Sequence, residues 1–195
     1  LNTSVLNALF NYNTDVVWVY RGKVIDIFSK AAFNKWLSVI CDQVYCDTPV
    51  YINEMVNKHK PSSAISTARV NFLAHLLDNG AEENLGFEDG KFPPEKTIYL
   101  TLLRNTGIHR RMGREYLLGE PRVESFMPRW NVCEAFLDST KEKPRKLGEL
   151  IKILRSRPFK LKQGVIDLWL PTFLIIKKND YSLYNDAGVY IHTIT

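Results

Sequence analysis

Apolar residues along the first quarter of the chain predict a short β-hairpin followed by a helix. Residues 16–20 and 24–28 are rich in β-branched and aromatic side chains, and Arg21-Gly22 between them is typical of a turn. Ser29 suits the N-cap of the next element, which we expect to run to about Tyr45. The apolar residues that recur there at helical spacing are Ala32, Phe33, Trp36, Leu37 and Ile40.

The middle of the chain alternates between helical patterns and stretches rich in Gly and Pro. A short helix is predicted over 50–56, and a longer one begins at Ser62 and is stopped by Gly80. After a loop, Pro94 opens a further helix that extends to about Arg104. Residues 108–127 show no period and contain two Gly and one Pro, so we expect a long loop there.

The end of the chain predicts three helices, over residues of about 128–138, 146–155 and 163–176, and then a hairpin around residues 185–188. The order helix, turn, helix, hairpin resembles the second half of a winged-helix fold. We therefore predict a mostly α protein of the α+β class. It has a helical accessory domain over residues 1–140, which carries the N-terminal β-hairpin, and a winged-helix-like domain with a β-hairpin over 141–195.

The predicted helix over 163–176 is apolar nearly all round, whereas a recognition helix must present a polar face to the major groove. It is therefore expected to be a core helix, with Trp169 and Phe173 packed against Leu150 and Leu154. A winged helix used for protein packing is at least as well indicated as one that reads DNA.

Charge is unevenly distributed, because the net charge of +5 arises from −2 over residues 1–100 and +7 over 101–195. The second half is the part that could meet a polyanion such as DNA, through phosphates and without sequence preference. An ordinary solvated basic surface remains the alternative. The candidate DNA-binding residues are Arg110, Arg111, Arg114, Arg145, Lys146, Arg155 and Arg157.

A polar cluster is predicted around Asn53, Glu54 and Asn57, which fall on one helical turn. Such a face either locks two helices together by hydrogen bonds or meets a ligand or partner. Arg69 and His109, the latter within a dense basic stretch, are added to this candidate interaction site. His75 lies in an amphipathic helical pattern and is expected to be a partly buried structural residue.

Several chemistries are disfavoured by spacing. Gly86 and Gly90-Lys91 have three residues between the glycines, whereas a phosphate-binding P-loop has four and continues with Ser or Thr. Residues 89–91 resemble half of a nuclease motif but lie in a Gly/Pro loop, so a nuclease or hydrolase is the weakest alternative. We predict no catalytic residue, no metal ligand and no cofactor.

The three cysteines are an odd set with no zinc-type spacing. Cys41 and Cys133 fall in apolar helical patterns and are expected to be buried. The longest apolar run, residues 168–176, is much shorter than the roughly 20 residues of a membrane span. We therefore expect a cytoplasmic protein with no membrane partner. The chain begins with Leu1 in place of Met, so it is expected to be a piece of a longer protein.

Several short motifs resemble a region C-terminal to the ATPase core of very large bacterial P-loop ATPases, of the kind encoded in phage-defence (BREX-like) loci. They are Thr48-Pro49 with Asn53-Glu54 and Asn57-Lys58, Ser62-Ser63-Ala64, Leu85-Gly86, Pro93 to Tyr99, Thr106 to His109, and Phe159 with Leu161 and Gly164. The family's Walker motifs have no counterpart in this sequence.

The resemblance implies a non-catalytic accessory or interaction module of a larger ATPase. Its expected partners are the rest of the parent ATPase chain, other defence-system subunits, and DNA. The alternative is a module that binds DNA directly through the basic second half of the chain.

Overall fold

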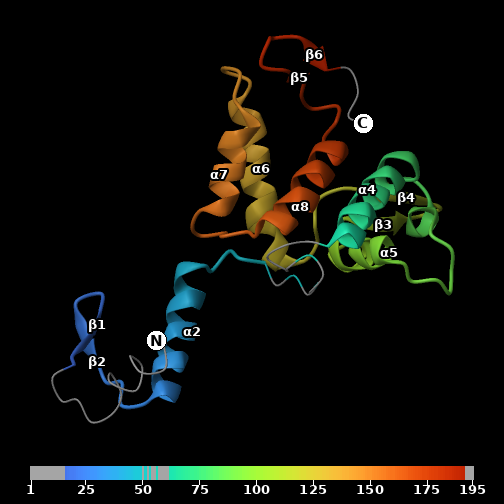
Figure 1. The fold of residues 1–195 in the computed structure, drawn as a ribbon. Helices are drawn as coiled ribbons and strands as arrows, with labels where there is room; N and C mark the ends of the chain where they lie inside the picture. The colour runs from blue at the N-terminus through green and yellow to red at the C-terminus, as the bar shows by residue number, and fades with distance from the viewer. Residues whose placement is uncertain (1–15, 50, 52, 54–55, 57–61, 192–195) are drawn as a thin grey trace. The chain divides into compact units, whose positions relative to one another are not determined.

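The structure, a computed structural model, describes residues 16–49, 51, 53, 56 and 62–191. The chain divides into two compact units, Leu1–Cys46 and Asp47–Thr195. The described residues form six α-helices and three two-stranded antiparallel hairpins, which confirms the α+β class (Figure 1). The observed division lies far from the predicted boundary near residue 140, because one hydrophobic core continues across that point.

The first unit contains the predicted hairpin and helix. Strands β1 (Trp18–Tyr20) and β2 (Lys23–Ile25) pair with Val19 opposite Val24. Helix α2 (Lys30–Val44) begins where Ser29 Oγ accepts a hydrogen bond from the Ala32 amide at 3.1 Å. None of its residues is buried, and Cys41 is exposed, so the predicted burial of Cys41 is wrong. Helical spacing specifies an apolar face but not what covers it.

The second unit begins with helices that supply much of its core. Ser62 caps α4 (Ser63–Asp78), and η1 (Glu83–Gly86), a 3-10 helix, follows. Helix α5 (Pro94–Tyr99) continues directly into a π-helical turn, η2 (Leu100–Arg104). The short helix predicted over 50–56 falls mostly on residues outside those described.

The stretch predicted as a long loop is instead a hairpin, formed by β3 (His109–Met112) and β4 (Glu115–Leu118), and a 3-10 turn, η3 (Glu124–Phe126). The prediction is wrong because the strands are four residues long and one carries adjacent arginines. Such a strand shows no apolar alternation for a sequence pattern to detect.

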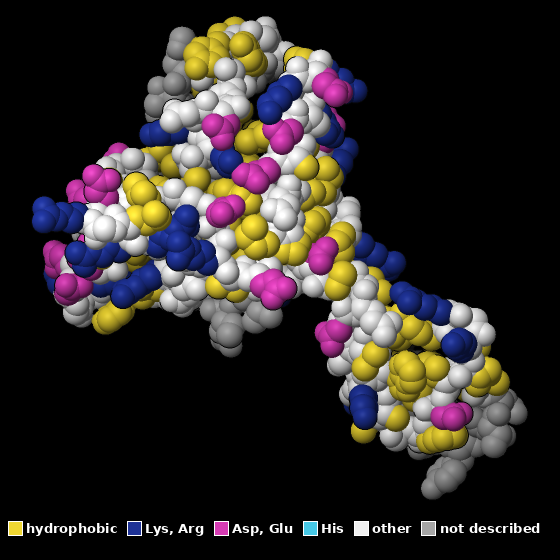
Figure 2. All heavy atoms as spheres, turned by 180° about the vertical axis from the view of Figure 1, so that it is seen from behind, with side chains coloured by type: hydrophobic (Ala, Val, Ile, Leu, Met, Phe, Trp, Pro, Cys, Tyr) yellow, Lys and Arg dark blue, Asp and Glu magenta, His cyan; other side chains and the backbone are white. Residues whose placement is uncertain are grey.

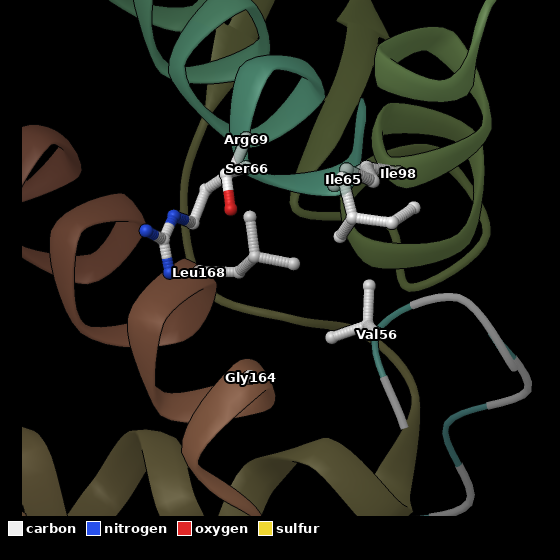
Figure 3. Close-up of a pocket in the computed structure, with 7 residues that line it drawn as sticks. All are labelled: Val56, Ile65, Ser66, Arg69, Ile98, Gly164 and Leu168. Atoms are coloured by element: carbon white, nitrogen blue, oxygen red, sulfur yellow. The ribbon is translucent and has the colours of Figure 1, made fainter. Parts of the chain in front are cut away.

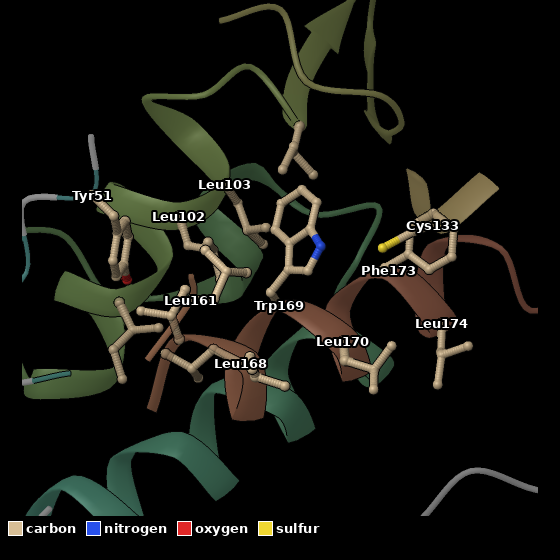
Figure 4. Packing of buried hydrophobic residues seen from close by; sticks show 14 of the residues in the cluster. Tyr51, Leu102, Leu103, Cys133, Leu161, Leu168, Trp169, Leu170, Phe173 and Leu174 are labelled. Atoms are coloured by element: carbon tan, nitrogen blue, oxygen red, sulfur yellow. The ribbon is translucent and has the colours of Figure 1, made fainter. Parts of the chain in front are cut away.

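The last elements follow the predicted order: α6 (Met127–Ser139), α7 (Leu147–Arg155), α8 (Gln163–Ile176), and the hairpin of β5 (Leu183–Tyr184) and β6 (Tyr190–Ile191). Nine of the fourteen residues of α8 are buried, and Trp169 is 1% exposed (Figure 4). The prediction of a core helix is confirmed. Helix α8 contacts both α4 and α7, and its Trp169 and Phe173 rings contact Trp130 of α6.

Candidate functional site

The β3–β4 hairpin brings together four of the predicted site residues, which are His109, Arg110, Arg111 and Arg114. Figure 2 shows basic side chains gathered over the end of the second unit that carries this hairpin, with acidic side chains among them. The other basic candidates lie at the two ends of α7. Since a helix rises 1.5 Å per residue, those two groups are separated by about 15 Å along α7.

Strand pairing determines which side chains share a face of the hairpin. His109 lies opposite Leu118, and Arg111 opposite Tyr116. Because residues two apart on a strand point the same way, these four side chains share one face. A two-residue turn joins the strands, and its first residue, Gly113, has a φ of +67°, which glycine adopts at little cost.

A row of rings anchors that face to the helices beneath it. Successive ring centroids are separated by 4.1 Å, 5.9 Å, 5.6 Å and 5.3 Å. This aromatic row consists of His75, Phe87, Tyr99, His109 and Tyr116. It confirms a partly buried, structural role for His75, whose Nδ1 also lies 3.0 Å from the Leu85 carbonyl oxygen. The base of the hairpin is therefore fixed to α4 and α5.

His109 is the buried member of the hairpin, with 3% of its surface exposed. Its Nδ1 lies 3.0 Å from the Tyr99 hydroxyl. Burial lowers the pKa of His109, and the backbone of Gly80 raises it by a smaller amount. The buried Nε2 has no hydrogen-bond partner among the described residues. Burial also raises the pKa of Tyr99 to about 12. Both groups are therefore neutral near pH 7, which suits a structural contact better than proton transfer.

The η1 turn beside the hairpin contains two residues in an unfavourable backbone conformation. Asn84 and Leu85 both have a φ of 52°, a left-handed conformation that costs a non-glycine residue roughly 1–2 kcal/mol. Asn84 Oδ1 accepts hydrogen bonds from Arg104 Nη1 at 3.2 Å and from the Tyr99 hydroxyl at 3.5 Å. The Leu85 side chain is fully buried. These contacts hold the turn against the hairpin.

Two arginines at the tip are free of acidic partners, whereas Arg110 is not available. Arg110 Nη1 donates to the carbonyl oxygens of Gly107 at 2.8 Å and Glu120 at 2.9 Å, so its guanidinium is committed to the backbone. Arg111 and Arg114 are exposed, and neither forms an ion pair with a described residue; Arg111 Nε donates to the Gly113 carbonyl at 3.0 Å.

The basic candidates around α7 are largely paired. Arg145 donates to Glu149 Oε2 from Nη2 at 2.8 Å and lies over the Phe136 ring. Lys146 Nζ lies 3.5 Å from an Asp186 carboxylate oxygen. Arg155 donates to Gln163 Oε1. Arg157 is exposed.

The structure describes three of the five residues of the predicted polar cluster, namely Asn53, Arg69 and His109. Asn53 is buried, and its Nδ2 donates to Thr101 Oγ1 at 3.2 Å, which favours a structural role. Glu54 and Asn57 lie outside the described residues. Arg69 instead connects α4 to α8, with Nη1 at 2.6 Å from Asp167 Oδ2. His109 belongs to the hairpin.

A small cavity lies beside Arg69, with a volume of about 20 Å³ (Figure 3). Val56, Ile65, Ile98 and Leu168 make most of its wall apolar. That volume is enough for about one water molecule and too small for an organic ligand.

A buried arginine was not found by sequence reasoning. Arg129 is 1% exposed, and its guanidinium carbon lies 3.4 Å from the centre of the Phe126 ring and 4.5 Å from that of Trp169. Its Nε and Nη2 have no hydrogen-bond partner among the described residues, and burial lowers its pKa to about 9. The sequence signal that could have indicated its burial is its spacing, because Arg129 precedes Cys133, which lies in an apolar helical pattern, by four residues, or about one helical turn.

A wide groove is the other feature that the sequence did not reveal. It has a volume of about 1020 Å³ and runs between the α6–α7 connection, α8 and the β5–β6 hairpin. Apolar and aromatic side chains form much of its lining: Phe136, Leu137, Leu147, Leu174, Tyr181, Leu183 and Tyr184. The Tyr181 hydroxyl donates to the Leu174 carbonyl at 2.8 Å, which ties the start of the hairpin to α8.

No family model matches this chain, and neither curated proteins nor solved structures include a detectable match. Among the described residues, no three His, Cys, Asp or Glu side chains are grouped so that they could hold a metal ion. Within the same residues, every helix is too short or too polar to cross a membrane.

Proposed function

We propose that this chain is a non-catalytic accessory module of a larger P-loop ATPase, and that it binds a protein partner through the groove. The partner is another part of the ATPase chain or a second subunit of the same system. The observation that carries the proposal is the groove of about 1020 Å³ with its apolar lining. The motif resemblance, which points to phage-defence ATPases, supplies the context.

The β5–β6 hairpin extends the apolar character of the groove onto the surface. Tyr184 is 60% exposed, and Val189, Tyr190 and Ile191 are exposed as well. Among the described residues, two pairs join β5 to β6. Neighbouring exposed apolar side chains on a short hairpin are typical of a surface that another chain covers.

The order of α7, α8 and the β5–β6 hairpin supports a winged-helix-like arrangement used for packing. Helix α8 would be the recognition helix of a DNA-reading winged helix, yet nine of its residues are buried. A buried helix has no polar face to offer a major groove. Protein binding is therefore better supported than base reading for this half of the chain.

Sequence-independent DNA binding is the second candidate function. The observation that favours it is the β3–β4 hairpin, whose exposed Arg111 and Arg114 form no ion pair with any residue that the structure describes. This contact would be made away from the groove, so both functions are compatible with one chain.

Gly148 allows a sharp test of the groove. It lines the groove, and a Cβ added there meets no atom within 4 Å. Gly148→Phe should therefore place a ring in the groove and obstruct a partner there without disturbing the core, while Gly148→Ala is the matched control. A photo-crosslinking residue in place of Tyr184 would report occupancy in the cells from which the chain comes, with products identified by mass spectrometry.

The expected result is a dominant crosslink to a P-loop ATPase or its subunit. It should be retained in Gly148→Ala and lost in Gly148→Phe. Crosslinks that survive Gly148→Phe unchanged, or that reach only abundant unrelated proteins, would contradict the proposal.

A further inference from the structure

We propose that the tip of the β3–β4 hairpin is a docking site for the phosphate backbone of duplex DNA, formed by Arg111, Arg114 and Arg104. This inference deepens the second candidate function and assigns its residues. It also removes three candidate contacts: Arg110, whose Nη1 donates to two carbonyl oxygens, and Arg145 and Lys146, which form ion pairs with carboxylates. Arg104 and Arg111 each donate a hydrogen bond to one uncharged oxygen and form no ion pair with a described residue.

The cations that remain available converge on Tyr116. Arg104 Nη1 donates to Asn84 Oδ1, and the neighbouring Glu83 accepts a hydrogen bond from the Tyr116 hydroxyl. That hydrogen bond raises the pKa of Tyr116, and the positive charges of Arg111 and Arg104 act in the opposite direction. Arg111 is the cross-strand neighbour of Tyr116, and Arg114 occupies the turn two residues before it.

Rigidity distinguishes this tip from an ordinary basic loop. The aromatic row fixes the base of the hairpin, and the two carbonyl contacts of Arg110 tie its strands to the flanking loops. Arginines held on a rigid ribbon lose little further freedom on binding, and a guanidinium matches the geometry of phosphate oxygens.

The shape and composition of the tip favour duplex DNA over an acidic protein. A two-stranded ribbon is narrow enough to enter a DNA groove. The tip carries its charge on arginines, whose planar guanidinium groups bind phosphate oxygens through two parallel hydrogen bonds.

Glu83 opposes this binding in the free protein. Its Oε1 accepts a hydrogen bond of 2.6 Å from the hydroxyl of Tyr116, the cross-strand partner of Arg111, so a carboxylate lies beside the ribbon that carries the tip arginines. An incoming phosphate would be repelled by this carboxylate. Glu83→Gln keeps an acceptor for Tyr116 while it removes the charge, and it should strengthen DNA binding by about two- to five-fold.

The experiment is fluorescence anisotropy of the whole chain with a random 20-base-pair duplex over a series of salt concentrations. Wild-type binding should weaken with salt. R111Q/R114Q should reduce the slope of log affinity against log salt by about 1.8, or about 0.9 for each phosphate that is no longer neutralised. The control K152Q/K178Q removes the same charge from exposed lysines elsewhere and should change the slope much less. Glu142→Gln is the control for Glu83→Gln.

Three outcomes would overturn the inference. The first is no binding by the wild-type chain at low salt, and the second is equal slopes for the two double variants. The third is competition by poly-glutamate as effective as that by unlabelled DNA, which would assign the tip to an acidic protein. The groove crosslink tests the proposed function separately, because R111Q/R114Q leaves every groove residue unchanged.

Discussion

Helix α8 and the β3–β4 hairpin are held in the second unit by different kinds of contact. Nine of the fourteen residues of α8 are buried, and its rings meet those of α6. The hairpin buries a single side chain, His109, and depends on hydrogen bonds and ring contacts with η1 and α5.

This difference bears on how each element responds to change. Apolar burial is roughly proportional to area and tolerates adjustment, whereas a buried hydrogen bond is lost outright when one partner goes. We therefore expect α8 to be destabilised by substitutions that remove side-chain volume. The hairpin should be destabilised by substitutions that remove a single hydrogen-bonding atom.

The largest expected effect is at Trp169. Trp169→Ala removes a ring from the centre of the core and should lower the free energy of unfolding by about 3–5 kcal/mol, because the cavity it leaves is only partly filled. Urea denaturation measures this. Phe92→Ala, at a ring that is largely exposed, is the control and should change stability by no more than about 0.5 kcal/mol. Similar losses in the two variants would show that α8 is not the centre of the core.

Arg129 is the one charged group within the apolar packing around α8 in the described part of the chain. Arg129→Met keeps a long side chain and removes a buried cation whose Nε and Nη2 have no hydrogen-bond partner among the described residues, so it should raise the free energy of unfolding by about 1–4 kcal/mol. Arg129→Lys, which retains the charge, should not stabilise. A Met variant less stable than wild type would mean that the guanidinium has a favourable acceptor.

Removing the Tyr99 hydroxyl tests how much a single hydrogen bond contributes to the stability of the hairpin. Tyr99→Phe leaves the ring in the aromatic row but removes the partner of His109 Nδ1, and it should cost about 1–3 kcal/mol. Tyr184→Phe removes an exposed hydroxyl and serves as the matched control. Equal stability of the two variants would show that the hydrogen bond between Tyr99 and His109 does not stabilise the hairpin.

The smallest effect is a pH dependence from His109. Its pKa in the folded chain is below the ordinary 6.5, so the unfolded chain takes up a proton first as the pH falls. Stability should therefore be complete above about pH 6.5 and fall below it, by about 1 kcal/mol or less. Comparing wild type with His109→Gln between pH 5 and 8 isolates this contribution, since the variant cannot titrate. Parallel curves would argue against a buried neutral ring.

The sequence predicted the elements held by apolar packing, such as α8, but not the β3–β4 hairpin. Helices α4 and α7 were predicted because their apolar residues recur at helical spacing, and α8 because its apolar run is long enough for a core helix. The β3–β4 hairpin was missed because its stability comes from rings up to about thirty residues away, and Arg110-Arg111 hides the alternation of its strand.

The candidate site was predictable as a set of charges but not as a geometry. Arg111 and Arg114 were identified from the basic composition of their segment. The pairing of Arg145 was signalled by Glu149 four residues later. By contrast, the carbonyl partners of Arg110 depend on backbone conformation that no spacing encodes.

The aromatic row has a consequence for transfer of the hairpin between proteins. His75, Tyr116 and every ring between them in the row come from one continuous stretch of chain, as do the strained η1 turn and Arg104. A segment of about fifty residues, 74–122, therefore carries both the basic tip and the contacts that orient it. Gene recombination or deliberate grafting would move the tip and its ring contacts together into a recipient that covers the apolar side of α5 and η2. The groove, assembled from α6, α8 and a separate hairpin, would have to be rebuilt from several segments.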